Sequence, residues 1–311
     1  MSRMHWSPAE MPSLAGTTAV VTGANSGIGY HAALELARKG AAVTLAVRSR
    51  ERGEQAAERI RGSAEAVDVR VRRLDLASLA SVREFAASWE GPLGLLVNNA
   101  GVMTPPRYQQ TEDGFELQLG TNHLGHFALT GRLLPALLSA PDSRVVTVSS
   151  LAHRQGRADV VEGHLAGRYS PSVSYGSSKL ANLLFAAELQ RRADLAGVSL
   201  TSTAAHPGVS HTGLVTSKQG LGALPGVSLL APVLLRALLQ SSKAGAVPTL
   251  YAATVADPGS YTGPQALRET RGRVGPATLG PLARDEQLAA KLWAVSEDLT
   301  GVRYAWDAGE D

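Results

Sequence analysis

The sequence predicts an α/β fold of the doubly wound kind: a single domain with a mostly parallel central sheet of about seven strands flanked by helices. Two observations predict it. Short β-branched segments alternate along the chain with longer segments whose apolar residues recur at helical spacing, which is typical of βαβ units. No linker rich in glycine, proline or serine divides the 311 residues, and no repeat is present beyond the βα unit itself.

The elements follow in order from these patterns. Strands are predicted at residues 17–22, 41–47, 69–74, 93–97, 144–148 and 198–204. Helices are predicted from a glycine turn through Lys39, from a cap at Ser78 to about residue 89, over about 111–138, from Tyr175 through residue 189, and at about 284–299. Residues 1–13 form a leader and 14–311 the domain, which includes a polar, irregular insertion at 151–174 and a lid at about 210–240.

Composition excludes several classes of protein. The chain has no cysteine, so disulfides, cysteine-ligated zinc and thiol catalysis are excluded. The net charge of +3 is scattered through helical segments rather than massed in a block, so no nucleic-acid partner is expected. The leader lacks the apolar core of a secretory signal, and we expect a cytoplasmic protein without an integral membrane segment. No metal is expected, because the histidines make no metal-binding pattern and are assigned to packing or to the pocket: His123, His126, His153, His164, His206 and His211.

A glycine-rich turn at residues 23–29 separates the first strand from its helix. Gly23 allows a tight turn, Gly27 lets the backbone approach a pyrophosphate, and Gly29 leaves room for the helix to lie close to the sheet. The amides that begin this helix offer a partial positive charge to phosphate. The turn therefore predicts a dinucleotide-binding site of the Rossmann type, completed by Asn25, Ser26 and Ile28.

Arg48 follows the second strand, where NAD-binding units usually carry an acidic residue that binds the ribose 2′-hydroxyl. A guanidinium can bind a 2′-phosphate bidentately, whereas a carboxylate would repel it. The predicted cofactor is therefore NADP(H), with NAD(H) left open.

Further residues suited to a ligand site follow the later strands where each one ends. In an open parallel sheet, the carboxyl ends of the strands form the edge at which ligands bind. The residues expected at that edge are Asp75, Leu76, Asn99, Ala100, Gly101, Ser149, Ser150, Pro207 and Gly208.

Tyr175 and Lys179 lie one helical turn apart, so a phenol and an ammonium can point into one cleft. A cation held beside a phenol favours the phenolate and lowers the pKa of the tyrosine. Tyr175 is therefore a candidate acid/base, although a pair with this spacing also occurs on ordinary amphipathic helices.

With these pieces in order, residues 14–264 resemble the short-chain dehydrogenase/reductase family. The resemblance is carried by the glycine pattern at 22–29, Asp75, the Asn-Asn-Ala-Gly run at 98–101, Asn122, Ser150, Tyr175 with Lys179, and Pro207 with Gly208. Within the family, the runs 121–127 and 148–153 resemble the retinol dehydrogenase and protochlorophyllide reductase branch. Protochlorophyllide reductases use a cysteine near the substrate, which this chain lacks.

The resemblance implies a role for each of these residues. Ser150 would stabilise the substrate oxygen, with Ser149 as the competing candidate, and Tyr175 would pass the proton. Lys179 would lower the pKa of the tyrosine and hold the nicotinamide ribose, while Asn122 would hold a water that relays protons to the lysine. The implied cofactor contacts are Asp75 and Leu76 at the adenine, Asn99, Ala100 and Gly101 along the dinucleotide, and Pro207, Gly208 and Thr212 toward the nicotinamide, with a helix cap as the alternative for Thr212.

The predicted function is that of an NADP-dependent oxidoreductase that interconverts a carbonyl and an alcohol; the alternative is a non-catalytic NAD(P)-binding sensor of the same fold. The apolar run at 221–235 is interpreted as a lid over a small apolar carbonyl or alcohol, with core packing and peripheral membrane contact as alternatives. A monomer or homodimer is expected. Family dimers often pair the helix bearing Tyr175 with the helix before Ser150, and the insertion at 151–174 could mask that face.

Overall fold

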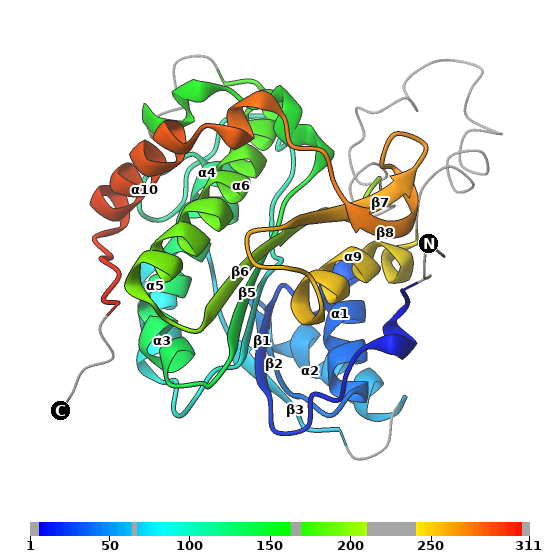
Figure 1. Ribbon diagram of the computed structural model, residues 1–311. Helices are drawn as coiled ribbons and strands as arrows, with labels where there is room; N and C mark the ends of the chain where they lie inside the picture. Colours follow the sequence, from blue (N-terminus) through cyan, green and yellow to red (C-terminus); the bar gives the residue numbers. More distant parts are fainter. Residues whose placement is uncertain (1–5, 64–66, 163–168, 210–240, 307–311) are drawn as a thin grey trace.

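The computed structural model describes residues 6–63, 67–162, 169–209 and 241–306. These segments fold around a central sheet with the strand order β3-β2-β1-β4-β5-β6-β7-β8 (Figure 1). The predicted lid at about 210–240 lies outside the described residues, and with it Thr212, His211 and the apolar run 221–235; His164 lies outside them as well.

The strands from β1 to β7 run parallel and β8 is antiparallel, so the predicted doubly wound, mostly parallel sheet is confirmed. The sheet of the described residues has eight strands rather than about seven. The additional edge strand was missed because glycine and proline interrupt the last two strands and weaken the β-branched pattern. The strands are β1 (Thr18–Thr22), β2 (Ala42–Val47), β3 (Val69–Arg73), β4 (Leu95–Asn98), β5 (Ser143–Val148), β6 (Leu200–Ala205), β7 (Tyr261–Ala266) and β8 (Arg271–Pro276).

Helices cover both faces of the sheet (Figure 1). Val21 of β1 belongs to the core on one face of the sheet, whereas its neighbour Val20 belongs to the core on the other face. Burial on both faces explains why the central strands read as continuous apolar runs. The longer helices are α1 (Gly27–Arg38), α2 (Arg50–Arg61), α3 (Leu79–Ala87), α5 (Gly125–Leu138), α6 (Pro171–Ala196), α9 (Ser242–Thr254) and α10 (Glu286–Thr300).

The helix expected at about 111–138 begins six residues later than predicted. Residues 111–115 form a turn in which Gly114 has a φ of +83°. The Glu116 carboxylate then caps the helix by accepting from the Leu119 amide at 2.8 Å. The short α4 (Leu117–Leu119), a π-helical turn (Gly120–Leu124) and α5 follow without a break. Asn122 lies within the π-helical turn, a feature frequent at functional sites.

The insertion predicted at 151–174 is shorter than expected. It contains two 3₁₀ turns, Leu151–Gln155 and Ala158–Glu162, and α6 already begins at Pro171. Proline suits the first turn of a helix because its missing N–H would be unpaired there in any case. Tyr175 therefore lies in the second turn of α6 rather than at its start.

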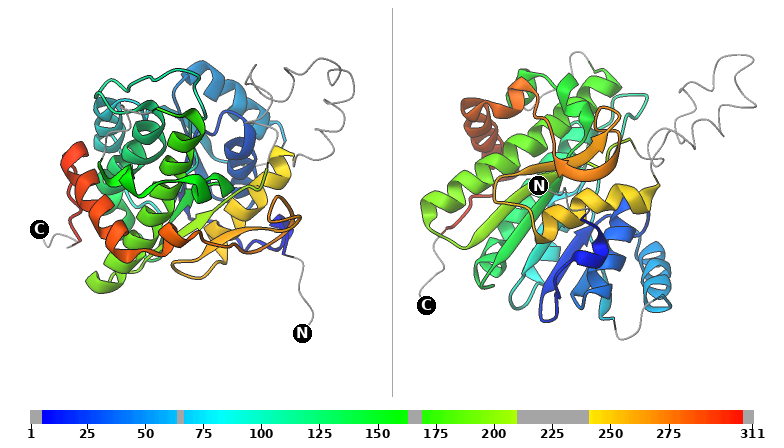
Figure 2. Two further views of the ribbon diagram at one scale, coloured as in Figure 1. Left: turned by 90° about the horizontal axis from the view of Figure 1, so that it is seen from above. Right: turned by 45° about the vertical axis from the view of Figure 1, so that its right-hand side comes forward.

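The carboxyl-terminal helix α10 packs on the outer side of α6, and both views in Figure 2 keep the two helices side by side. Trp293 of α10 stacks on Phe185 of α6 with ring centroids 5.9 Å apart, and the Arg192 guanidinium lies 4.5 Å above the Trp293 ring. His123 of the π-helical turn is hydrogen-bonded through Nε2 to the Ser296 hydroxyl of α10 at 2.8 Å. This packing buries Leu292 and Trp293 of α10, each of which is 2% exposed.

Within the described segments, no helix is both long enough and apolar enough to cross a membrane. The cytoplasmic location stays a prediction.

Candidate active site

A cavity of about 700 Å³ opens at the carboxyl ends of the strands. The strand order reverses there, because β1 pairs with β2 on one side and with β4 on the other, and ligands of doubly wound folds bind at such a reversal. Of the predicted site residues, those that line the cavity are Gly23, Asn25, Ser26, Gly27, Ile28, Gly29, Arg48, Asp75, Leu76, Asn99, Ala100, Gly101, Ser149, Ser150, Tyr175, Lys179, Pro207 and Gly208.

The glycine turn has the backbone geometry of a phosphate cradle. Gly23 and Gly27 have φ values of +67° and +60°, which residues with a side chain rarely adopt. A Cβ at Gly29 would lie 2.7 Å from the Gly23 carbonyl oxygen and would also clash with the side-chain amide of Asn99. The Ser26 side chain does not cap α1, so the first amides of that helix stay available to an anion. These features fit the pyrophosphate of a dinucleotide.

Thr22 ties the end of β1 to the turn that follows β4. Its hydroxyl oxygen accepts from the Asn99 and Ala100 amides at 2.9 Å each. His126 Nδ1 lies 2.9 Å from the Asn122 carbonyl, so this nitrogen must donate, and Nε2 accepts from the Thr22 hydroxyl at 2.9 Å. Burial lowers the pKa of His126 to about 4, which keeps this neutral tautomer at pH 7. The network fixes the floor of the cavity.

One end of the cavity is basic. Arg48 is exposed and lines this end, as predicted from its position after β2. Arg52, in the first turn of α2, is also exposed and lines the cavity, and the sequence analysis missed it. The sequence does contain a signal for Arg52, because a serine at position 49 can cap a helix and so place residue 52 one turn after Arg48. The structure has this cap: the Ser49 hydroxyl accepts from the Arg52 amide at 3.4 Å. Two guanidiniums are therefore available to a 2′-phosphate.

The other end of the cavity carries the hydroxyl and amine groups. The Ser149 hydroxyl donates to the Lys179 carbonyl at 2.7 Å, and only 2% of Ser149 is exposed. Ser150 is half-buried; its hydroxyl accepts from the Ala152 amide at 3.2 Å and lies near enough to Tyr175 to lower the pKa of the phenol. Of the two serines, Ser150 is the one placed beside the phenol.

Lys179 lies above the Tyr175 ring, with Nζ 5.8 Å from the ring centroid, and donates to the Val148 carbonyl at 3.0 Å. Burial lowers the pKa of Lys179 to about 8. Burial also raises the pKa of Tyr175, and the neighbouring Ser150 side chain only partly opposes this effect. The pKa of Tyr175 is therefore raised overall, and the contribution of Lys179 to lowering it stays a prediction.

Asn122 does not line the cavity, in contrast to the other three predicted catalytic residues. Its Oδ1 accepts from the Val102 amide at 2.8 Å, and its Nδ2 donates to the Val102 carbonyl at 3.0 Å and to Ser178 at 2.9 Å. All of its amide protons are thus used within the protein. The side chain holds the cavity wall at Val102 against α6. Its predicted part in holding a water stays a prediction.

Other residues that line the cavity were not predicted. Their positions depend on how loops from different strands meet, and single-sequence motifs do not mark them. They are Ala46, Ser49, Leu74, Val102, Met103, Thr121, Val148, Leu151, Ala152, Gln155 and Val209.

The chain matches the family model of the short chain dehydrogenases over residues 17–220. It is similar to retinol dehydrogenase 13 of Homo sapiens, at 42% identity over 296 residues, which cover 93% of this chain and 86% of the relative. It is equally similar to polyprenol dehydrogenase of Mus musculus, at 42% identity over 309 residues, covering 94% and 87%.

Solved structures share the fold of this chain. An uncharacterized protein from Mycobacterium Paratuberculosis superimposes with a TM-score of 0.81 at 45% identity, covering 97% of this chain and 100% of that one. A short chain dehydrogenase from Escherichia coli CFT073, solved in complex with NADPH, has a TM-score of 0.52 at 26% identity, covering 64% and 79%. With the cradle and the Ser150, Tyr175 and Lys179 cluster in one cavity, these similarities identify the chain as a member of the short-chain dehydrogenase/reductase family, in its retinol dehydrogenase-like branch of oxidoreductases that act on alcohols and carbonyls.

Proposed function

We propose that the protein is an NADPH-dependent reductase of lipophilic aldehydes or ketones, with Tyr175 as the proton donor. The observation that carries the proposal is the meeting of a phosphate cradle, two arginines and the Ser150, Tyr175 and Lys179 cluster in one cavity. The names of the two curated relatives denote lipophilic alcohols, retinol and polyprenol, which supports an apolar substrate. Apolar side chains in the same cavity, Met103, Leu151 and Val209, support it as well.

The residues that would hold the cofactor follow from the cavity. The glycine turn and the start of α1 would bind its pyrophosphate, and Arg48 with Arg52 its 2′-phosphate. Lys179 would hold the nicotinamide ribose. Bound NADPH would supply the hydride that reduces the carbonyl carbon.

The chain itself handles the oxygen and the proton. Ser150 would donate a hydrogen bond to the substrate oxygen, where negative charge develops. Tyr175 would transfer its hydroxyl proton to that oxygen, and its raised pKa keeps the phenol protonated at neutral pH. The buried Lys179 ammonium would stabilise the phenolate that the transfer leaves behind.

A panel of carbonyl compounds, monitored through NADPH absorbance, tests the function. We expect retinaldehyde and long-chain aldehydes to be reduced with a higher kcat/KM than glyceraldehyde or other hydrophilic carbonyls. If no carbonyl in the panel oxidises NADPH although NADPH binds, the non-catalytic sensor becomes the better account.

Cofactor preference should depend on the two arginines at the basic end of the cavity. NADPH is expected to bind at least about tenfold more tightly than NADH, a difference of ~1.4 kcal/mol. Arg48→Asp should reverse the order, because a carboxylate repels the 2′-phosphate and accepts from the 2′-hydroxyl, and Arg52→Ala should weaken NADPH alone. Arg50→Asp is the matched control, because Arg50 does not line the cavity and its side chain is 76% exposed. Equal affinities of the parent protein for both cofactors by calorimetry would remove the argument.

The position of α10 should prevent two copies of the chain from pairing through α6. This helix covers the side of α6 that faces away from the sheet and places Leu292, Trp293 and Leu288 in buried contacts. A second copy therefore cannot pair with α6 through that face unless α10 moves. We propose a monomer, and sedimentation at micromolar concentration should give the 32.5 kDa of one chain. A stable dimer or tetramer under these conditions would contradict this expectation.

A further inference from the structure

The turn between β7 and β8 has an unusual backbone. Leu267, Arg268 and Glu269 are consecutive residues with φ values of +49°, +58° and +66°, and none of them is glycine. Residues with a side chain rarely adopt this left-handed conformation, and a run of three requires that the surroundings hold it in place. The contacts of Glu269 account for much of that support.

The Glu269 side chain joins the turn to two other segments of the chain. One carboxylate oxygen accepts from the Thr278 amide at 2.9 Å and from its hydroxyl at 2.6 Å. The other accepts from the Arg154 guanidinium at 2.7 Å. Only 15% of the Glu269 side chain is exposed. Burial by itself would raise its pKa, but the Thr278 hydrogen bonds and the charge of Arg154 lower the pKa below its ordinary value, so the carboxylate stays ionised.

Through Arg154, Glu269 holds the 3₁₀ turn that starts after Ser150. Arg154 and His153 both belong to this turn, Leu151–Gln155. His153 Nδ1 donates to the Ser150 carbonyl at 2.7 Å, and its Nε2 accepts from the Gly280 amide at 3.0 Å. The backbone at Ser150 is thus fixed from the segment that follows β8.

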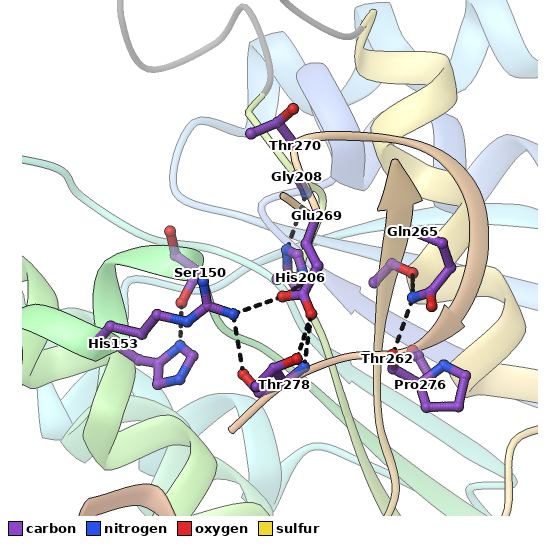
Figure 3. Close-up of polar contacts among 12 residues, drawn as sticks. Ser150, His153, His206, Gly208, Thr262, Gln265, Glu269, Thr270, Pro276 and Thr278 are labelled. Carbon is purple, nitrogen blue, oxygen red and sulfur yellow. Dashed lines mark hydrogen bonds and ion pairs between the residues drawn. The ribbon is translucent and has the colours of Figure 1, made fainter. Parts of the chain in front are cut away.

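The same β7–β8 turn also holds the opposite wall of the cavity, which follows β6. The Val209 amide donates to the Thr270 carbonyl at 3.0 Å, directly after Glu269. His206 Nδ1 accepts from the Gly208 amide at 3.2 Å, so Nε2 carries the proton. Among the residues that the structure describes, this buried Nε2 has no hydrogen-bond partner, and it lies 3.9 Å from the Glu269 carboxylate. Figure 3 shows the Glu269 carboxylate beside His206 and Gly208, with Ser150 and His153 to their left.

We propose that Glu269 is a positioning residue that sets the distance between Ser150 and the wall formed by Pro207, Gly208 and Val209. These two walls bound the end of the cavity that contains Tyr175, where the nicotinamide and the substrate carbonyl must meet. The inference rests on the proposed function for the identity of that end. It predicts that Glu269 affects the nicotinamide half of the cofactor and not the adenosine half, which binds near Arg48.

Two ligands separate these halves: NADPH and adenosine 2′,5′-bisphosphate, each titrated by calorimetry. Glu269→Gln can accept from Thr278 or from Arg154 but no longer from both, so it loosens one wall. We expect it to weaken NADPH binding by about tenfold and to leave the bisphosphate within about twofold. Arg154→Gln should have a similar effect, and the double variant should cost no more than either single one, because both remove one shared contact. The KM for the carbonyl substrate should rise and kcat should fall.

The matched control is Glu297→Gln. Glu297 is an arginine-paired glutamate of equal burial, 2.6 Å from Arg303 with 16% of its side chain exposed, and it does not line the cavity. Glu297→Gln should leave the affinities for NADPH and for the bisphosphate unchanged. It should lower the melting temperature by about as much as Glu269→Gln does. A Glu269→Gln protein that binds both ligands as the parent does, or that loses both equally, would overturn the proposal. If that variant does not fold, Arg154→Gln decides the matter alone, because its side chain is 40% exposed. The ratio of the NADPH affinity to the bisphosphate affinity does not depend on turnover. A parent protein that reduces no carbonyl would therefore contradict the proposed function, but it would not test the positioning role of Glu269.

Discussion

Replacing Tyr175 with phenylalanine is expected to lower carbonyl reduction by about 10²-fold or more, the usual contribution of a positioned acid/base. The substitution removes one oxygen, which lies beside the Ser150 side chain. The aromatic ring beneath Lys179 is kept, so packing and cofactor binding should change little. The melting temperature in the presence of NADPH should therefore stay close to that of the parent protein, while single-turnover reduction slows.

Tyr169→Phe provides the control. The Tyr169 hydroxyl donates to the Pro105 carbonyl at 2.6 Å and does not line the cavity, so its loss should leave turnover unchanged. Near-normal turnover in Tyr175→Phe, on a substrate that the parent reduces well, would rule out Tyr175 as the proton donor.

Replacing Lys179 with methionine is expected to abolish most turnover without destabilising the fold. The pKa of Lys179 is lowered to about 8 by burial, which means that the unfolded chain holds this proton more strongly. The charged amine therefore opposes folding at pH 7, and this penalty disappears only as the pH rises toward the unfolded value. The Val148 carbonyl keeps a partner in the variant, because Asn182 also donates to it at 3.0 Å. Methionine of similar length should consequently preserve the melting temperature at pH 7.

The pH dependence of the reduction rate tests whether the positive charge of Lys179 contributes to catalysis. In the parent, the rate of reduction should fall as the pH rises through about 8, because Lys179 loses the charge that stabilises the Tyr175 phenolate. Lys179→Met should be slow and should show no such step. Combined with Tyr175→Phe, its effect should be smaller than the product of the two single effects, since the two residues act as a unit. Lys39→Met is the control, because Lys39 also donates to backbone carbonyls but does not line the cavity. A step near pH 8 that persists in Lys179→Met would assign it to another group.

The fold class and most of the residues that line the cavity could be predicted from the amino-acid sequence. Strand and helix periodicities are local, and the carboxyl ends of parallel strands must meet at one edge of the sheet. The glycine turn, Arg48 and the Tyr175 and Lys179 pair could therefore be placed together without coordinates. The spacing of Tyr175 and Lys179 within one helix needed no tertiary information at all.

The direction of individual side chains and the contacts between distant segments could not be predicted in this way and come from the folded structure. It placed Ser150 rather than Ser149 beside the phenol, added Arg52 to the basic end of the cavity, and engaged Asn122 with Val102. It also brought Glu269 to Arg154, a contact between residues 115 positions apart. Contacts of this kind depend on the packing of several loops at once. No local pattern in the sequence encodes them, because the free energy of each side-chain conformation is set by neighbours that arrive only when the sheet has assembled.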